Sequence, residues 1–218
     1  MKKYLLYCFF TNDYSKIINT WLEQTAYKFF PEETDILVLT DRPELVVNPH
    51  DNVIVKKLSN VSKFRNQELW RKSFRHMQVL NEYKDKYEIF AHIQSNCFLP
   101  HGLNDDIITF DKNKLTVIAH TCTDIGIRLA DFHCKIGSSG YRPLALYKGI
   151  WKHVGMMFGG YDVFYDAVKS CHEMYLKDKK NNLLYKVPYH DESLLNSWCC
   201  DNPDKIVVLP RVPSGTLN

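Results

Sequence analysis

The cysteines of this sequence form no recognisable pattern. The 218 residues contain seven, which is an odd number, and no two of them stand in a CxxC spacing. Scattered cysteines argue against a disulfide framework and against a zinc ribbon, and they suit a reducing compartment.

Long apolar runs and a strong net charge are also missing. No stretch approaches the ~20 apolar residues that a membrane-spanning helix needs. The apolar run after Met1-Lys2-Lys3 ends by Thr11-Asn12 without a small-residue cleavage site, so we interpret it as a buried strand and not as a signal peptide. The net charge of +3 is too small to indicate a nucleic-acid partner.

What is present is the composition of a globular protein, with 45% apolar and 24% charged residues. The chain has no internal repeat, no low-complexity tract and no obvious linker. We therefore predict a single domain over residues 1–218.

The first half alternates strand and helix patterns. Strands are predicted at 4–10, 35–40, 53–58 and 89–93. A first helix is predicted to reach residue 30. A second, long helix is predicted at 63–83, with Trp70, Phe74, Met77 and Leu80 on one face. This order predicts an α/β fold with a mostly parallel sheet. Ligands of such sheets bind beyond the carboxyl ends of the strands, where polar residues follow: Thr11 and Tyr14, Thr40 and Asp41, and Gln94-Ser95-Asn96.

The second half is less regular. Strands are predicted at 115–119 and 206–209, and helices at 161–176 and from Asp191 onward. Residues 177–182 are predicted to be a solvated loop, and no element is assigned to 121–151. Asp191 and Glu192 stand side by side at this last helix start. Asp191 is a candidate cap, and Glu192 either stabilises the helix dipole or serves chemistry.

A second motif, residues 153–160, ends in Gly159-Gly160. Paired glycines let the backbone approach a ligand or turn tightly into a helix. We predict that this stretch and residues 189–196 form one sugar-transfer site.

Four motifs, taken in their order along the chain, resemble those of glycosyltransferase family 6. They are Thr11-x-x-Tyr14, Leu39-Thr40-Asp41-Arg42-Pro43, Gly155-x-x-x-Gly159-Gly160 and His190-Asp191-Glu192-Ser193-x-x-Asn196. That family includes the histo-blood-group A and B transferases, the α-1,3-galactosyltransferases and shorter bacterial members. The resemblance implies a GT-A fold, a Rossmann-like and mostly parallel sheet flanked by helices. Residues 1–100 would form the nucleotide-binding half and 101–218 the acceptor-binding and catalytic half.

The resemblance also implies a reaction. Galactose or N-acetylgalactosamine would move from a UDP-sugar to a galactose-type glycan or glycolipid in an α-1,3 linkage, with retention of configuration. Glu192 would be the nucleophile or the stabiliser of an oxocarbenium-like transition state, and Asp191 would grip the donor sugar.

Further site residues follow from the same resemblance. Donor binding would fall to Phe9, Thr11, Tyr14, Arg75, Gln94, Asn96 and His190. His120 would face the acceptor, and Val154 and Met156 would read the substituents of donor and acceptor. Because Met156 is larger than Gly or Ala, it favours UDP-galactose as the donor.

The sequence departs from most GT-A enzymes at the metal site. Gln94-Ser95-Asn96 replaces the Asp-x-Asp that holds Mn²⁺ or Mg²⁺, and hard cations prefer anionic oxygen ligands. We therefore predict no metal and no other cofactor, with Arg75, Lys179 or Lys180 compensating the charge of the leaving UDP. The alternative is that Asp105 or Asp106 recruits a metal.

With no membrane anchor, the resemblance points to a bacterial enzyme of the cytoplasm. Its acceptors would be precursors of surface polysaccharide, and it would have possible peripheral contact with the inner membrane face. Two alternatives stay open. One is a glycosyltransferase of another GT-A family, retaining or inverting, and the other is a non-catalytic member of the fold that binds nucleotide or glycan.

Overall fold

The computed structural model describes residues 2–27, 33–62, 65–98, 111–120, 129–148, 150–209 and 215–216. Asp105 and Asp106, the alternative metal ligands, lie outside these ranges, as do Phe29 and Phe30 of the first predicted helix.

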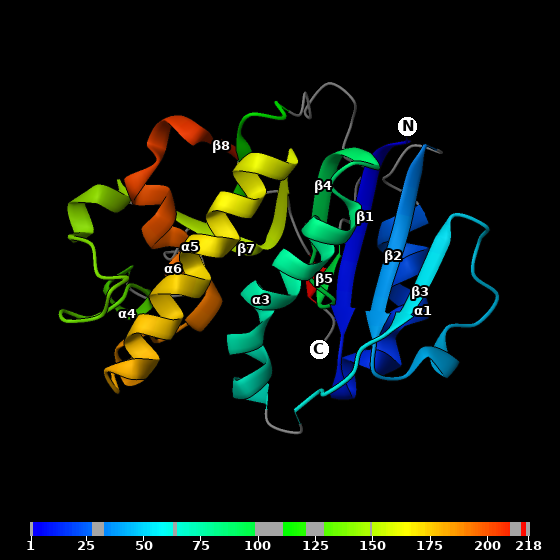
Figure 1. Cartoon of the computed structure of the whole chain (residues 1–218), viewed down its shortest axis with the longest axis horizontal. Coiled ribbons are helices and arrows are strands. Elements are labelled where there is room, and N and C mark those ends of the chain that lie inside the picture. The colour runs from blue at the N-terminus through cyan, green and yellow to red at the C-terminus, as the bar shows by residue number, and fades with distance from the viewer. Residues whose placement is uncertain are drawn as a thin grey trace.

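A twisted sheet forms the centre of the protein (Figure 1). Among the described residues it has seven strands in the order β3-β2-β1-β4-β7-β6-β8. Only β7 runs antiparallel to its neighbours. The strands are β1 (Lys2–Phe10), β2 (Thr34–Thr40), β3 (Val53–Lys57), β4 (Tyr87–Ile93), β6 (Leu115–His120), β7 (Trp151–Gly159) and β8 (Ile206–Leu209), and β5 (Cys97–Phe98) pairs with β9 (Gly215–Thr216). The predicted α/β class with a mostly parallel sheet is therefore confirmed.

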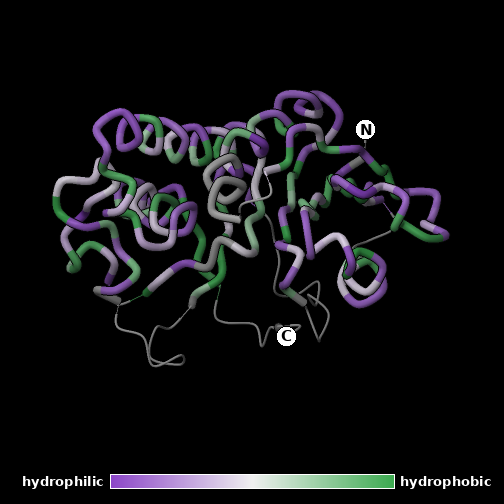
Figure 2. The backbone as a smooth tube through the Cα atoms, turned by 90° about the horizontal axis from the view of Figure 1, so that it is seen from below, coloured by the Kyte–Doolittle hydropathy of each residue, from purple (hydrophilic) through white to green (hydrophobic). Residues whose placement is uncertain are grey.

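Helices cover both faces of the sheet. Along β1 and β2, successive side chains alternate between two buried clusters, because neighbouring residues of a strand point to opposite faces. One cluster packs under α3 (Arg65–Tyr83), α5 (Tyr161–Lys180) and α6 (His190–Asp201). The other packs against a helical segment made of η1 (Asn12–Ile17), α1 (Ile18–Trp21) and η2 (Leu22–Ala26). In Figure 2, the colour of the helices at the top of the view changes between hydrophilic and hydrophobic within successive turns, as in helices with one buried face.

Short helical turns complete the described chain. They are η3 (Pro43–Leu45), α4 (Leu129–Phe132), η5 (Leu144–Tyr147), η6 (Leu184–Lys186) and η7 (Pro203–Lys205).

The sequence analysis did not identify β7. Its register against β6 shifts between Val117 and Ile118, whose partners are Met157 and His153. Such a bulge breaks the alternation by which a strand is recognised, and Gly155 lies within it. The segment is nevertheless a strand at the centre of the sheet.

The buried face of α3 differs from the predicted one. Phe74 is 46% exposed, whereas Lys72 and His76 are buried beside Leu80. Both polar side chains find partners beneath the helix: Lys72 at Asp191 and His76 at Tyr7. Leu80 and Met77 of the predicted apolar face do pack in or against the core, and the prediction was wrong for Phe74. Lys72 and His76 belong to the buried face because their polar groups have partners beneath the helix. The side chain of Trp70 lies outside the described part.

The predicted loop at 177–182 is largely helix, since α5 continues to Lys180. Asp178 is fully buried and accepts hydrogen bonds from the Ser138 hydroxyl and from the Ser139 N–H at 2.7 Å. Its carboxylate thereby anchors the turn at residues 138–140 to the end of α5.

Close backbone packing explains Gly159-Gly160. The Gly160 N–H donates to the Lys112 carbonyl at 3.1 Å, and a Cβ on Gly160 would lie 2.4 Å from that oxygen. A Cβ on Gly159 would lie 3.1 Å from the Lys114 carbonyl. The pair permits the tight entry into α5.

We predict that Gly160→Ala lowers the free energy of unfolding by about 1–3 kcal/mol, because the new methyl group overlaps a backbone oxygen that cannot move aside cheaply. Gly159→Ala, the matched control, should cost less, since its contact is longer. Urea unfolding of both variants measures the difference. Equal stabilities of the two variants would contradict this account.

Candidate functional site

The ends of β1 and β2 are tied together at the carboxyl edge of the sheet. Asp41 accepts hydrogen bonds from the Asn12 N–H at 3.1 Å and from the Ser15 hydroxyl at 2.6 Å. These bonds hold the start of η1 against the end of β2. Thr11 and Tyr14 lie in this segment, joined by a bond from the Tyr14 N–H to the Thr11 carbonyl at 3.2 Å.

The end of β4 carries Gln94-Ser95-Asn96 at the same edge. The Gln94 N–H donates to the Gly155 carbonyl of β7 at 2.7 Å, and the Gln94 carbonyl accepts from the Cys97 N–H at 2.9 Å. Gln94 and Asn96 are half-buried, and Ser95 is buried. The triplet is therefore a turn fixed between β4 and β7.

The start of α6 is held by Ser193 and not by Asp191. The Ser193 hydroxyl oxygen accepts from the Tyr189 N–H at 3.0 Å and donates to the Phe132 carbonyl at 2.6 Å. The prediction that Asp191 caps the start of α6 was therefore wrong. Three residues further on, the Asn196 side chain accepts from the Lys152 N–H and donates to the Lys152 carbonyl, both at 2.8 Å. Asn196 thereby joins α6 to the start of β7.

Asp191 forms an ion pair with Lys72. The Lys72 ammonium donates to Asp191 Oδ2 at 2.7 Å, and the two side chains are only 10% and 16% exposed. The pair connects α3 to α6 across 119 positions of sequence. Sequence analysis missed Lys72, although its spacing of four from His76 and eight from Leu80 puts all three on one helix face.

Glu192 lies near the Gln94–Cys97 turn. Burial raises the pKa of the Cys97 thiol to about 12; the Glu192 carboxylate adds to the rise and the Lys72 ammonium opposes it. Both charges therefore act on the residue that follows the polar triplet. The half-buried Glu192 is thus near enough for its charge to act on Cys97, and Asp191 beside it is held by Lys72.

Neutral aromatic groups form a layer beneath this edge. Tyr7 Oη lies 2.7 Å from His76 Nδ1, and the rings of His76 and His92 are 4.5 Å apart. Burial is the main reason why the pKa of both imidazoles lies well below its usual value, and neighbouring positive groups, Lys72 among them, lower it further. Phe9 packs against the same two histidine rings at the end of β1.

The other donor-side residues lie on α3 and α6. Arg75 is 9% exposed on α3, three positions after Lys72. His190 is the first residue of α6, with a positive φ of 41°. Burial lowers the pKa of His190, and the Asp191 carboxylate works against that shift.

The residues predicted on the acceptor side are less well supported. His120 ends β6 opposite Trp151, and Val154 lies in β7, but the side chains of both are outside the described part. Met156 is 2% exposed and packs in the cluster on the η1–η2 face of the sheet. Cys97 of the Gln94–Cys97 turn belongs to the same cluster. The role of Met156 in limiting a donor pocket stays a prediction.

The two motifs meet only in part. Gly155 lies against Gln94, whereas Gly159 pairs with Phe90, further back along β4. Four residues of strand separate the two glycines by about 13 Å. The start of β7 therefore contacts α6 and the end of β4, whereas the glycine pair lies farther back along the sheet. That residues 153–160 and 189–196 form one sugar-transfer site stays a prediction.

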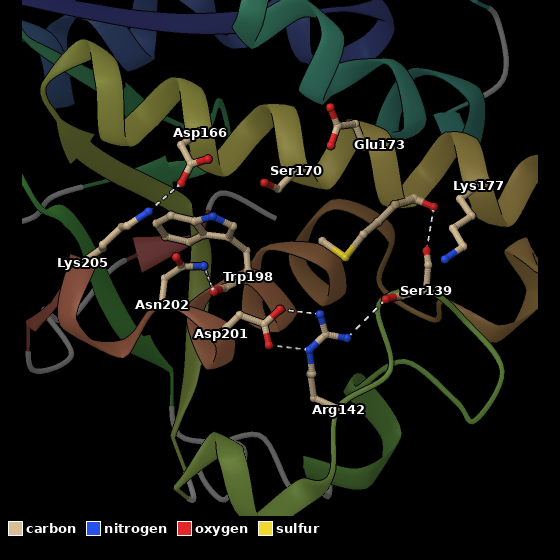
Figure 3. A pocket seen from close by; sticks show the side chains of 11 residues that line it. Ser139, Arg142, Asp166, Ser170, Glu173, Lys177, Trp198, Asp201, Asn202 and Lys205 are labelled. Atoms are coloured by element: carbon tan, nitrogen blue, oxygen red, sulfur yellow. Dashed lines mark hydrogen bonds and ion pairs between the residues drawn. The ribbon is translucent and has the colours of Figure 1, made fainter.

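A pocket of about 410 Å³ lies elsewhere, between α5 and the end of α6 (Figure 3). Its charged groups are largely paired: Arg142 with Asp201, and Lys205 with Asp166 at 3.1 Å. Asp201 ends α6, so this pocket is separated from Asp191 by about 15 Å of helix.

Within the described ranges, His, Cys, Asp and Glu side chains nowhere gather in threes as a metal site requires. Likewise, none of the helices described here has the length and apolar character to cross a membrane. The chain matches no protein-family model and no curated protein.

We predict that Lys72→Met destabilises the protein by about 3–5 kcal/mol, because it leaves the largely buried Asp191 carboxylate without its counter-charge. Adding Asp191→Asn should restore part of the loss, so that a double-mutant cycle gives a clear coupling energy. Urea unfolding provides the four stabilities.

The Lys56–Glu82 pair is the matched control, since its side chains are 37% and 50% exposed. The same cycle with Lys56→Met and Glu82→Gln should give a coupling below about 1 kcal/mol. A coupling no larger at Lys72–Asp191 would show that this ion pair does not hold α3 and α6 together.

Proposed function

We propose that this protein is a retaining glycosyltransferase of the GT-A type. It moves galactose or N-acetylgalactosamine from a UDP-sugar to a galactose-type glycan acceptor in an α-1,3 linkage. The observation that carries the proposal is the first turn of α6, where Asp191 is paired with Lys72 and the charge of Glu192 acts on Cys97, the last residue of the Gln94–Cys97 turn. Open α/β sheets bind their ligands at the carboxyl edge, where this turn follows β4.

The architecture supports the GT-A part of the proposal. A mostly parallel sheet with helices on both faces is the framework that the fold requires, and the described chain has it. The segment Thr11–Tyr14 and the Thr40-Asp41 pair lie at neighbouring strand ends and are linked by hydrogen bonds. They supply a polar rim for uracil and ribose, beside Phe9.

The charges suit the chemistry. Retaining transfer passes through an oxocarbenium-like state, and a fixed negative charge near the anomeric carbon stabilises it. Glu192 is the group for this role, either as nucleophile or as shield on the leaving-group face. Asp191 is held by Lys72 and stays fixed in a position to accept hydrogen bonds from the sugar hydroxyl groups.

The leaving UDP gains negative charge, which a nearby cation must compensate. The charge of Lys72 is already balanced by Asp191, so Arg75 is the candidate on α3 for this compensation. Lys179 and Lys180 lie at the exposed end of α5.

The cellular setting is part of the same proposal. The enzyme works in the bacterial cytoplasm on precursors of surface polysaccharide. The choice between UDP-galactose and UDP-N-acetylgalactosamine is left to the donor panel below, since the role of Met156 in limiting a donor pocket stays a prediction.

We predict that Glu192→Gln lowers kcat by at least about a thousandfold while UDP still binds, because the amide keeps the shape of the side chain and removes its charge. A panel of UDP-sugars, assayed for hydrolysis and for transfer to a galactoside, gives the rates. NMR of the product gives its anomeric configuration.

The control is Glu173→Gln, an exposed glutamate of α5, which should leave kcat unchanged. Near-native activity of Glu192→Gln would reduce Glu192 to a helix-start residue. A β-linked product would favour an inverting enzyme, and binding of UDP with no hydrolysis of any donor would favour a non-catalytic member of the fold.

We further predict that transfer needs no divalent metal. Gln94, Ser95 and Asn96 are neutral and hold Mn²⁺ poorly, whereas their N–H and O–H groups donate directly to phosphate or sugar oxygens. The rate should survive exhaustive EDTA treatment and should not rise when Mn²⁺ is added. Activity that disappears with chelator and returns with metal would refute the prediction and direct attention to Asp105 and Asp106.

A further inference from the structure

Exposed apolar side chains concentrate in two segments, 133–150 and 183–189. Nine large apolar residues are exposed in the described part of the chain, and six of them belong to these segments. They are Ile136, Leu144, Leu146, Ile150, Tyr185 and Tyr189. Segment 133–150 lies at the end of the molecule opposite β3 (Figure 1). The remaining three residues are scattered over other elements.

The two segments pack against each other. The Lys135 N–H donates to the Lys186 carbonyl at 2.8 Å, and the Lys186 ammonium donates to the Ile136 carbonyl at 2.8 Å. Between them lies a predominantly apolar groove of about 460 Å³, lined by His133, Lys135, Ile136, Tyr141, Tyr185 and Lys186. Ile136 and Tyr185 border it with exposed fractions of 73% and 78%.

The charge of this region has one sign. Residues 133–150 and 179–189 contain six basic residues and no acidic one: Lys135, Arg142, Lys148, Lys179, Lys180 and Lys186. Two acids contact segment 133–150: Asp178 is buried under Ser138 and Ser139, and Asp201 pairs with Arg142. The charges of that pair cancel, which leaves the five lysines as the charge of this region. Lys186 contacts a carbonyl and the Tyr185 ring, which are neutral groups that leave its charge uncompensated.

We propose that this face, called here the basic apolar face and made of residues 133–150 and 179–189, docks on the surface of a bilayer that contains anionic phospholipid. Lysines attract the negative headgroups, while isoleucine, leucine and tyrosine side chains enter the headgroup region. A protein partner fits less well, since lysine is depleted at protein–protein interfaces.

Docking has a consequence for the proposed reaction. Tyr189 is 39% exposed, stacks on Phe132 at 4.3 Å and immediately precedes α6. A face that rests on the membrane therefore brings the start of α6 toward the headgroups, where a lipid-linked acceptor is found. This step rests on the proposed glycosyl transfer, whereas docking itself requires neither donor nor acceptor.

Co-sedimentation of the full-length protein with vesicles tests the proposal. The protein should bind vesicles of phosphatidylcholine mixed with phosphatidylglycerol much more than vesicles of phosphatidylcholine alone, and added salt should weaken the binding. Replacing Lys148 by Asn should weaken the binding about fivefold. Ile136→Ser with Tyr185→Ser should weaken it by on the order of tenfold.

The control is Val47→Ser with Lys57→Ser. This pair also combines an exposed apolar residue with a lysine, but on η3–β3. It should bind as the native protein does. Circular dichroism confirms that each variant is folded, and donor hydrolysis in the absence of lipid should be unchanged in all of them, which separates this proposal from the proposed function.

Three results would overturn the docking proposal. One is no preference of the native protein for anionic vesicles. Another is equal loss of binding in the control variant. The third is a concentration-dependent dimer that Ile136→Ser and Tyr185→Ser disrupt, because the face would then be an interface between two copies of the chain.

Discussion

A largely buried contact between an ammonium and a carboxylate group determines how the two halves of this protein meet. Lys72 and Asp191 lose most of their water, so each requires the other at hydrogen-bonding distance. The contact joins the inward side of α3 to the first turn of α6, whose start is itself held by Ser193. His76 then lies over Tyr7, Phe74 is left at the surface, and Glu192 is carried to the end of β4.

Elements whose residues follow one local rule could be predicted from the sequence. The strands at β1, β2 and β4 are continuous apolar runs between breaking residues, and α5 repeats Val163, Ala167 and Cys171 at helical spacing. Elements shaped by distant partners could not be predicted. The bulge hid β7, and Asp178 seemed to belong to a loop because its partners, Ser138 and Ser139, lie about 40 positions away.

The same distinction applies to the candidate site. Polar residues directly after strands, such as Asp41 and Gln94, were correctly expected at the carboxyl edge because parallel strands end together. Lys72 escaped notice because a lysine in a helix is usually solvent-exposed, and only its partner on α6 explains its burial. Met156 was assigned to a pocket from its place in a motif, and that role stays a prediction; the side chain is buried in the cluster that also holds Cys97.

The position of β7 has a consequence for synthesis on the ribosome. β7 lies between β4 and β6, but it is the second-to-last strand of the seven to be made. Until residues 151–159 have emerged, β4 has no second neighbour, and a strand from the middle of the finished sheet behaves as an edge with unpaired N–H and C=O groups. A chain that stalls before Trp151 therefore presents an apolar strand edge that other nascent chains can pair with, and the hazard ends when β7 fills the gap.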